Sequence, residues 1–275
     1  MSTGQIENIG RTAFVVSEVR AGEAERQPRL FDDPFAPLFS SPASKAAVQR
    51  AQQSLGPLFA CSFRVRTRWF DDLLQRELAR GTRQVLILGA GMDCRSLRFP
   101  RPGVTYFEVD APSVLAIKAE RLEQAGHPRG AVAIGTDYLA PGLFDLLAEN
   151  GFDRALSTLV LWEGNVCYLP PDEMRRLLRS LGESIPDVRV AFDGFGTPIV
   201  EERSRVPALN QATALFRSMG APWQCGIDDL PALAREANLR VLEEVSFGEL
   251  MARLLPDQEL GDAAAAEVFQ CLLAR

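Results

Sequence analysis

Short, unbroken runs of apolar residues recur from residue 84 onward, separated by longer segments whose apolar residues fall at helical spacing. The clearest run, QVLIL at residues 84–88, is typical of a strand that is buried on both faces of a parallel sheet. Regular alternation of strands and helices predicts an α/β fold with a doubly wound sheet and right-handed crossovers. Strands are expected at residues 84–88, 104–109, 131–134, 155–161, 188–192, 241–247 and 267–273.

The segments between these strands are spaced as amphipathic helices. Pro112 and Pro171 open two of them, in the first turn, where proline is tolerated because that position has no helical N–H partner. The four alanines at 263–266 favour a helix by propensity, but we interpret them as the approach to the last strand. Helices are expected at residues 112–125, 141–149, 171–181, 208–219 and 232–237.

Residues 1–80 show helical periodicity and few strand signals. A helix is expected at residues 12–24, ended by the proline-containing segment DDPFAPLF. A second helix is expected at residues 68–80, with Gly81 as its C-cap. Neither an internal repeat nor a low-complexity linker interrupts the sequence, so we predict a single domain over residues 1–275.

The composition is that of a globular protein, with 47% hydrophobic and 24% charged residues among 275. A net charge of −6 disfavours a nucleic-acid partner, because nucleic acids usually bind a basic surface. No apolar run reaches the roughly 18 residues that span a bilayer, and the N-terminus lacks the basic start and apolar stretch of a secretory signal. We therefore expect a cytoplasmic protein that binds neither membranes nor nucleic acid.

Cysteine and histidine offer little catalytic or metal-binding chemistry. The five cysteines are scattered, with no CxxC pair, which predicts reduced thiols and no bound metal. The single histidine, His127, lies in the turn-like run AGHPRG, where a structural or exposed role is expected. Nucleophilic triads that use histidine would depend on this one residue, and we do not assign it a role.

A glycine loop follows the first expected strand directly, as Gly89, Ala90 and Gly91. Ligands of open α/β sheets bind beyond the carboxyl ends of the strands, and glycines let the backbone approach them closely. A dinucleotide fingerprint would have a third small residue at position 94, but the loop continues with Asp93 and Cys94. Because a carboxylate repels a pyrophosphate but accepts from amino and hydroxyl groups, the loop favours a ligand without phosphates.

Two further acids follow the next strands. Asp110 ends the run TYFEVD, 19 residues after Gly91, where a carboxylate can accept from both ribose hydroxyls of an adenosine. The alternative role of Asp110 is to cap the helix that begins near Pro112. Asp137 follows the next strand and could accept from an adenine amino group, with Tyr138 beside the ring. Together, three successive loops predict an adenosine site.

At this point the chain resembles the leucine carboxyl methyltransferase family, including bacterial members that methylate natural-product acids and polyketides. The matching segments cover most of residues 11–180 in the family's order, and their combination is far more specific than any one of them. They are RTAFVVSEVRAGE, DDPFA, VRTRWFDD, RQVLILGAGMDCRSLR, YFEVDAPSVLAIK and LWEGNVCYLPPDEMRRLL.

The resemblance implies S-adenosylmethionine as the cofactor and a class I methyltransferase fold. This fold is a Rossmann-like sheet of seven strands with the last strand antiparallel, plus an N-terminal helical lid. It divides the single domain into a lid (residues 1–80), a cofactor-binding core (81–192), a substrate-pocket insertion (193–240) and the final strands (241–275).

The resemblance also implies which residues hold the cofactor. In the family an arginine before the glycine loop binds the methionyl carboxylate, and the run FRVRTR leaves Arg64 and Arg66 as alternatives. Glu163 matches an acid near the methionine part of the cofactor, and Arg20 is expected to reach the site from the lid. The implied cofactor-binding set is Arg64, Arg66, Gly89, Ala90, Gly91, Asp93, Asp110, Ala111, Asp137, Tyr138 and Glu163.

The expected activity is O-methylation of a carboxylate or acidic hydroxyl of a small molecule, in natural-product biosynthesis. A carboxylate, whose ordinary pKa is roughly 4, is ionised at neutral pH and attacks without a general base. Relatives often follow the adenine-site aspartate with leucine and arginine, whereas this chain has Asp137-Tyr138-Leu139, which weakens the case for a protein C-terminus as substrate. An NAD(P)-dependent oxidoreductase and a non-catalytic adenosine-binding module are two further functions that the sequence leaves open.

Aromatic residues near the end of the resemblance and beyond it could shape a substrate pocket. Tyr168 is a possible substrate contact, although an aromatic in VCYLP also fits core packing. The same two interpretations stay open for the later residues Phe192, Phe195, Phe216, Met219 and Trp223.

Overall fold

The computed structural model describes the backbone of residues 3–258 and 267–275, and the side chains of residues 12–258 and 267–275. The alanine stretch at 263–266, interpreted from the sequence as the approach to the last strand, lies outside the described residues. Among the described residues, no helix is both long enough and apolar enough to cross a membrane.

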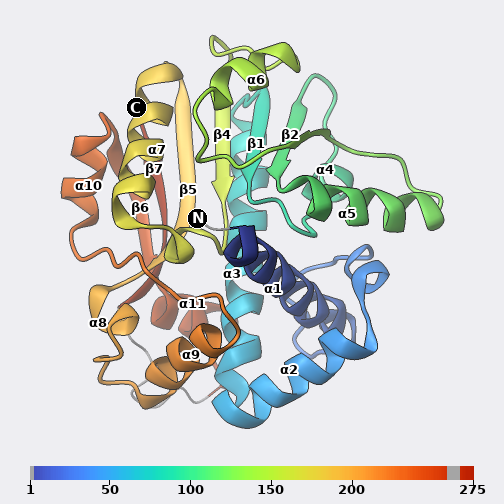
Figure 1. Cartoon of the computed structure of the whole chain (residues 1–275), viewed down its shortest axis with the longest axis vertical. Helices are drawn as coiled ribbons and strands as arrows, with labels where there is room; N and C mark the ends of the chain where they lie inside the picture. The colour runs from blue at the N-terminus through green and yellow to red at the C-terminus, as the bar shows by residue number, and fades with distance from the viewer. Residues whose placement is uncertain (1–2, 259–266) are drawn as a thin grey trace.

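A seven-stranded sheet forms the centre of the molecule, in the order β3-β2-β1-β4-β5-β7-β6 (Figure 1). The first five strands run parallel, and β7 is antiparallel to both of its neighbours. This arrangement confirms the predicted doubly wound sheet with an antiparallel last strand. The strands are β1 (Gln84–Leu88), β2 (Thr105–Asp110), β3 (Val132–Gly135), β4 (Thr158–Trp162), β5 (Val188–Phe195), β6 (Arg240–Ser246) and β7 (Val268–Ala274).

Helices pack on both faces of the sheet, because β1, β4 and β5 present apolar side chains to each side. Leu159, Leu161 and Ala191 pack with α3 (Pro57–Ala79) and α11 (Phe247–Leu254) on one face. On the other face, Val160 and Phe192 pack with α6 (Leu143–Glu149), α7 (Pro171–Ser184) and α10 (Leu230–Glu236). The remaining helical segments after β1 are α4 (Arg95–Arg98), α5 (Pro112–Gln124), η3 (Val166–Tyr168), α8 (Thr197–Val200) and α9 (Pro207–Ser218).

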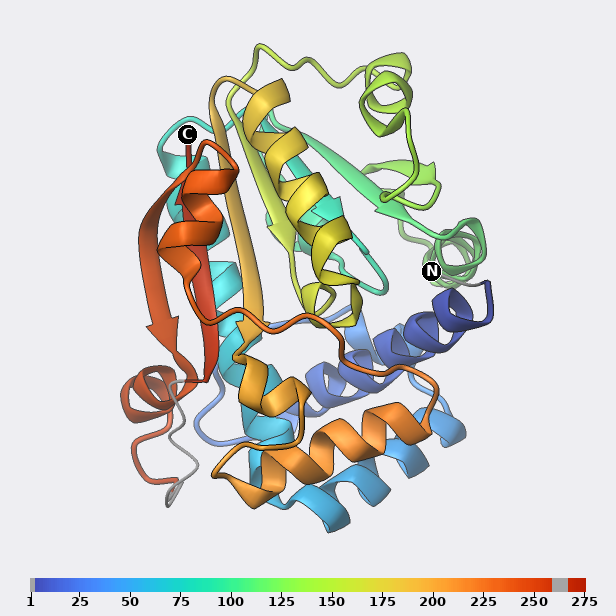
Figure 2. The same ribbon diagram turned by 60° about the vertical axis from the view of Figure 1, so that its left-hand side comes forward.

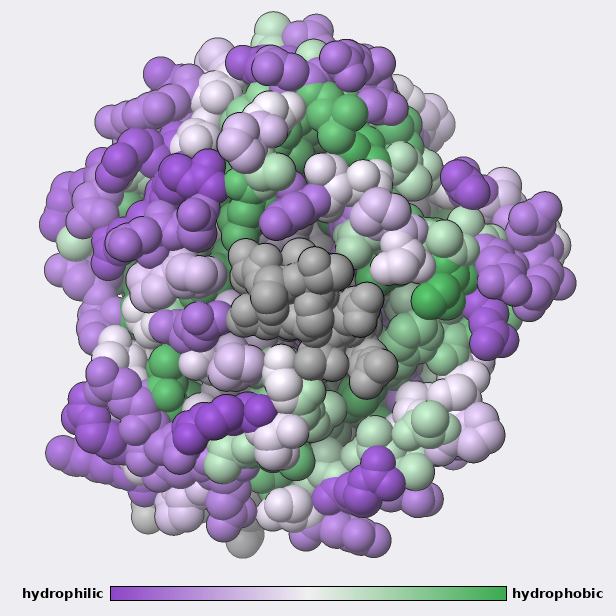
Figure 3. All heavy atoms as spheres, in the orientation of Figure 1, coloured by the Kyte–Doolittle hydropathy of each residue, from purple (hydrophilic) through white to green (hydrophobic). Residues whose placement is uncertain are grey.

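The N-terminal helices form a layer beside the carboxyl ends of the parallel strands. The layer contains α1 (Thr3–Ala21), η1 (Gly22–Glu25), η2 (Ala36–Phe39) and α2 (Pro42–Leu55). Helices α2 and α9 are far apart in sequence but lie side by side there (Figures 1 and 2). On the face of the molecule seen in Figure 1, hydrophilic residues dominate the rim, and hydrophobic residues lie nearer the middle (Figure 3).

The first three helices differ from the predictions. Helix α2 was not predicted, because its apolar residues are few; it begins at a capping box of Ser41 and Ser44 and buries Val48, Ala51 and Leu55. Helix α3 begins eleven residues earlier than the predicted residue 68, directly after Gly56. The predicted first helix ends at Ala21, with the short 3₁₀ segment η1 completing the range.

Every strand except β1 differs from its predicted bounds by at least one residue, and the largest differences are in β4 and β5. The strand predicted at 155–161 begins only at Thr158, because Asp153 accepts from the N–H of Ala155 and holds a turn there. Strand β5 continues past residue 192 to Phe195. Residue 247 belongs to α11 rather than β6, because Ser246 and Glu249 form a capping box.

Candidate cofactor and substrate site

A cavity of about 390 Å³, here called the first cavity, opens where β1, β2 and β4 end. This is the edge of the sheet at which open α/β folds bind their ligands. Of the residues that the sequence assigned to a cofactor, ten line this cavity, and Arg20 from α1 joins them. The ten are Arg66, Gly89, Ala90, Gly91, Asp93, Asp110, Ala111, Asp137, Tyr138 and Glu163.

The glycine loop brings bare backbone to the floor of the first cavity. Gly89 and Gly91 have φ angles of 65° and 47°, in the left-handed region that favours glycine. A Cβ on Gly89 would lie 2.5 Å from Asn165, and one on Gly91 would lie 3.0 Å from the Cβ of Ala13. Asn165 also donates to the carbonyl of Gly89 at 3.1 Å, so the loop after β4 fixes the loop after β1.

Asp110 is held by the backbone on both sides of its carboxylate. Its two oxygens accept from the N–H groups of Gly91 and Ala111, each at 2.6 Å. Burial raises the pKa of Asp110, against the effect of these two hydrogen bonds. The N-cap of α5 is Ala111, so Asp110 joins two loops instead of capping the helix. Its remaining lone pairs are available to a ligand in the cavity.

Asp137 and Tyr138 form the part of the wall beyond β3. One carboxylate oxygen of Asp137 accepts from the N–H of Leu139 at 2.9 Å. The ring of Tyr138 packs edge-on against Trp162, with centroids 6.1 Å apart. Burial raises the pKa of the Tyr138 hydroxyl well above its usual range. The wall at this end therefore combines a carboxylate with a fixed aromatic ring.

The structure separates the two candidate arginines of α3. Arg66 donates to Glu163 at 3.0 Å and to Asp193, at the end of β5, at 3.2 Å. Arg64 lies outside the first cavity and pairs with the buried Glu23, at 2.6 Å, and with the carbonyl of Pro28. Of the two, only Arg66 faces the place where a ligand would lie.

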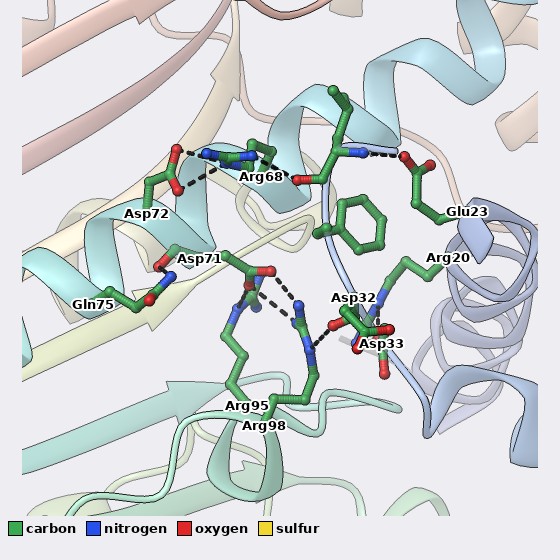
Figure 4. Close-up of polar contacts among 12 residues, drawn as sticks. Arg20, Glu23, Asp32, Asp33, Arg68, Asp71, Asp72, Gln75, Arg95 and Arg98 are labelled. Carbon is green, nitrogen blue, oxygen red and sulfur yellow. Dashed lines mark hydrogen bonds and ion pairs between the residues drawn. The ribbon is translucent and has the colours of Figure 1, made fainter. Parts of the chain in front are cut away.

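A network of buried ion pairs supports the wall behind Arg66. Arg95, which is 1% exposed, pairs with Asp71, Asp93 and Glu163. Burial opposes ionisation of Asp93, but Arg95 and Arg20 outweigh it and lower the pKa of its carboxyl to about 2. Figure 4 shows Arg95 beside Arg98, both directed at Asp71, and Arg20 reaching Asp33. The pKa values of Asp33, Asp93 and Glu163 are all lowered by these arginines, so their carboxylates are ionised at neutral pH.

A second cavity of about 130 Å³ adjoins the first. Four residues line both cavities, and we call them the junction: Thr12, Val16, Arg66 and Gly164. The walls of the second cavity are mostly apolar, and its aromatic residues include Phe59, Phe63, Tyr168, Phe195, Phe216 and Trp223.

Met219 and the aromatic residues singled out in the sequence have three different positions. Phe195, Phe216 and Trp223 line the second cavity, with the rings of Phe216 and Trp223 stacked 5.1 Å apart. Phe192 is fully buried in the core beside the sheet, and Met219 is 38% exposed. Tyr168 also lines the second cavity, and burial raises the pKa of its hydroxyl well above the usual range.

Several lining residues were not predicted. Thr12, Ala13 and Asn165 lie within segments that match the family but show no chemical signal of their own in the sequence. Asp193 and Gln270 line the second cavity as buried polar residues within largely apolar strands. A polar residue inside a buried strand is the signal that could have identified these two.

The model of the family described as leucine carboxyl methyltransferase matches residues 13–182. The chain belongs to this family. A relative in Streptomyces coelicolor, assigned as an S-adenosyl-L-methionine-dependent methyltransferase, is 38% identical and covers 94% of each chain. A relative in Parafrankia with the same assignment is 37% identical over 76% of this chain and 71% of its own. These assignments confirm the predicted family and cofactor.

Solved structures support the fold. A crystal structure from Thermobifida fusca, assigned as a methyltransferase, has a TM-score of 0.61 and covers 94% of this chain and 93% of that one. At 15% sequence identity, this likeness is evidence for the class I methyltransferase architecture alone.

The described residues of the first cavity suit S-adenosylmethionine chemically. Gly89 and Gly91 line the cavity without side chains, so the backbone of the glycine loop can lie against a ligand. Asp110 and Asp137 provide acceptors of the kind that ribose hydroxyls and an adenine amino group require. Arg66 provides donors for a carboxylate, and Glu163 provides acceptors for an ammonium group. The cavity therefore matches each polar part of this cofactor with a group of opposite hydrogen-bonding character.

Proposed function

We propose that this chain transfers the methyl group of S-adenosylmethionine to an oxygen of a small acidic molecule, a carboxylate or an acidic hydroxyl. One observation carries the proposal: a cavity with acceptors for adenosine adjoins, at the four junction residues, an apolar cavity with aromatic walls. The first suits the cofactor and the second suits an organic acceptor. Natural-product biosynthesis is the setting that we infer from the resemblance to bacterial family members.

The proposal assigns the cofactor contacts to residues of the first cavity. Asp110 would hold the ribose hydroxyls, Asp137 the adenine amino group, and the backbone from Gly89 to Gly91 would lie along the cofactor. Arg66 would pair with the methionyl carboxylate. The bound sulfonium supplies an activated methyl group, so the protein contributes alignment and the exclusion of water, which can lower a barrier by several kcal/mol.

The charged groups of the second cavity favour an acceptor oxygen that is already ionised. The raised pKa of Tyr168 keeps its hydroxyl protonated at neutral pH. The carboxylate of Asp193 is held by Arg66 and by the N–H of Gly164, at 2.5 Å. Burial raises the pKa of Asp193, but both of its oxygens already accept hydrogen bonds. A carboxylate or a strongly acidic hydroxyl, which needs no proton acceptor, therefore fits the cavity better than a neutral alcohol.

The proposal gives parts of the chain outside the core distinct roles. Residues 1–80 would act as a lid, because α1 supplies Thr12, Ala13, Val16 and Arg20 to the cavity walls. Residues 193–240 would form much of the substrate pocket, through Phe195, Phe216 and Trp223 among others. A small enclosed pocket of this kind favours a small molecule over the C-terminus of a protein.

Calorimetric titration of the purified protein with S-adenosylmethionine, S-adenosylhomocysteine and NADH tests the cofactor. Binding of the two sulfur ligands and not of NADH is the expected result, and binding of NADH alone would overturn the proposal. Radiolabelled methyl transfer to a panel of carboxylic acids and phenols then tests the reaction. Cofactor binding with no transfer to any acceptor would indicate a non-catalytic adenosine-binding module.

A further inference from the structure

Three polar residues lie in a row across the sheet where the second cavity begins. In the pairing of β4 with β5, Trp162 lies opposite Phe192, so the next residues, Glu163 and Asp193, are neighbours. On the other side of β5, Asp193 lies opposite Gln270 of β7. Residues paired across an antiparallel ladder have their side chains on the same face of the sheet. The row therefore extends from the first cavity into the second.

Gln270 has an unusual environment for a side-chain amide. The residue is 2% exposed and lines the second cavity. Its Oε1 atom is buried and has no hydrogen-bond partner among the described residues. Leaving a buried acceptor unpaired costs about 1–3 kcal/mol, and such atoms are rare in folded proteins. A donor that reached Oε1, after rotation of the amide plane toward the cavity, would remove this cost.

Asp193, next to Gln270, is also an acceptor. The residue is 5% exposed, and its two oxygens accept from the N–H of Gly164 at 2.5 Å and from Arg66 at 3.2 Å. An ionised carboxylate has about four acceptor positions and no donor. Burial raises the pKa of Asp193, and Arg66 and the N–H of Gly164 oppose this effect. As a carboxylate, Asp193 presents acceptors to the cavity beside the Gln270 amide, so a ligand group that pairs with Asp193 must donate.

The surroundings of this pair are apolar. Phe195 lies two residues further along β5, and Val268 lies two residues before Gln270 on β7; both line the cavity with Phe247. A polar group that entered here without partners would be costly to bury. The acceptor pair thus marks one defined position in an otherwise hydrophobic site.

We propose that the substrate carries a hydrogen-bond donor, a hydroxyl or amino group, at the end remote from its methyl-accepting oxygen, and that Gln270 and Asp193 bind this donor. This inference rests on the proposed function. Neighbouring strands lie about 4.8 Å apart, so β7 is about 10 Å from β4, where the junction residue Gly164 follows the strand. The substrate is accordingly an apolar, ring-bearing acid with its donor roughly 5–10 Å from the accepting oxygen, by the same spacing.

Matched pairs of acids test the inference on the whole chain. The probes are 3-(4-hydroxyphenyl)propanoic acid and 3-phenylpropanoic acid, together with longer homologues of the same pair. Binding is measured by calorimetry to protein saturated with S-adenosylhomocysteine, and methyl transfer with labelled S-adenosylmethionine. Sites built to bind a hydroxyl reject analogues that lack it by large factors, so we expect a preference on the order of a hundredfold for hydroxylated members.

Two variants distinguish a role in recognition from a role in packing. Gln270→Met removes the acceptor at similar volume, and it should bind both members of each pair equally while keeping the wild-type affinity for S-adenosylhomocysteine. Gln270→Glu retains an acceptor and should retain the preference. Gln75→Met, an exposed residue of α3 outside both cavities, is the surface control.

The outcomes separate this inference from the proposed function. The inference is overturned if the wild-type protein binds both members of a pair equally, or if it binds no hydroxylated acid. In either case, binding of S-adenosylhomocysteine would still support the cofactor site. An unchanged preference in Gln270→Met also overturns it. Loss of S-adenosylhomocysteine binding by the wild-type protein would instead contradict the proposed function.

Discussion

Arg64 and Arg66 are two positions apart on α3, and their guanidinium groups lie in different parts of the molecule. Arg64 pairs with Glu23 outside the cavity, whereas Arg66 pairs with Glu163 and Asp193 at the junction. Residues two apart on a helix point in nearly opposite directions, so one helix face cannot hold both. The sequence left open which of the two arginines faces the cofactor site. The direction in which each side chain leaves α3 decides this in favour of Arg66.

Replacing Arg66 by alanine should weaken cofactor binding. A charge-assisted pair with the methionyl carboxylate contributes about 1.5–3 kcal/mol, which corresponds to a loss of roughly ten- to a hundredfold in affinity for S-adenosylhomocysteine. Calorimetry measures this loss directly. Arg64→Ala is the matched control: it leaves Glu23 buried without its partner, so it should lower the free energy of unfolding but keep the affinity of the folded protein. Equal affinity losses in both variants would contradict the assignment of Arg66.

Asp110→Ala should reduce the affinity for S-adenosylhomocysteine by about 1–3 kcal/mol, because the ribose hydroxyls would lose their carboxylate partner. Asp145→Ala, which removes an exposed carboxylate from α6, should leave the affinity unchanged. Both affinities are measured by calorimetry at one ionic strength. If the Asp110 variant bound as tightly as the wild type, Asp110 would not be the ribose ligand.

The sequence carried most of the information about the fold and the first cavity, for a physical reason. Glycine loops and acids at strand ends are local patterns, and parallel strands bring their carboxyl ends to one edge. Gly89, Asp110 and Asp137 are recognisable before the fold is known because each follows its own strand directly. The seven-stranded sheet could be predicted in the same way, from apolar runs that are too short for helices.

The second cavity could not be assembled from local patterns. Most of its residues come from α1, α2, α3, η3, β5, α9, α11 and β7, and only the tertiary structure brings them together. Phe192 and Phe195 are three positions apart on the same strand, yet one lies in the core and the other lines the cavity. Helix α2 was not predicted because its alanine and polar residues give it little hydrophobic periodicity.

Gly89→Ala should lower both stability and cofactor affinity. The new Cβ would lie 2.5 Å from Asn165, and the backbone would hold alanine at a φ of 65°. Gly142→Ala is the matched control, because Gly142 has a φ of 86° with nothing within 4 Å of the added Cβ. The control isolates the backbone strain, which costs about 1 kcal/mol. Urea unfolding and calorimetry should show a larger loss at Gly89.

The contribution of Asn165 can be separated from that of the backbone. In the double variant Gly89→Ala with Asn165→Ala, the contact with the new Cβ is relieved, so part of the lost stability should return. The free energies of unfolding of the two single variants and the double variant are compared. If the losses in Gly89→Ala and Asn165→Ala simply add up in the double variant, the two side chains do not interact.

Stability should depend on pH through Asp93. Its folded pKa of about 2 lies below the unfolded value of about 3.9, so its contribution is fully present above that value. It should be lost as the pH falls from about 4 to about 2, and it amounts to about 2 kcal/mol. Asp93→Asn should be less stable than the wild type at pH 7 by urea unfolding. The difference should shrink as the pH falls below about 4, and a constant difference down to pH 3 would contradict this account.

The two cavities have almost separate walls, since only the four junction residues belong to both. The family match ends at residue 182, and Asp193, Phe195, Phe216, Trp223 and Gln270 all lie beyond it. Under the proposed function, mutations of the later apolar residues, which do not contact Arg66, would change which acceptor is methylated without altering the binding of the methyl donor. Such an arrangement would let a lineage diversify its products while its cofactor site stays the same.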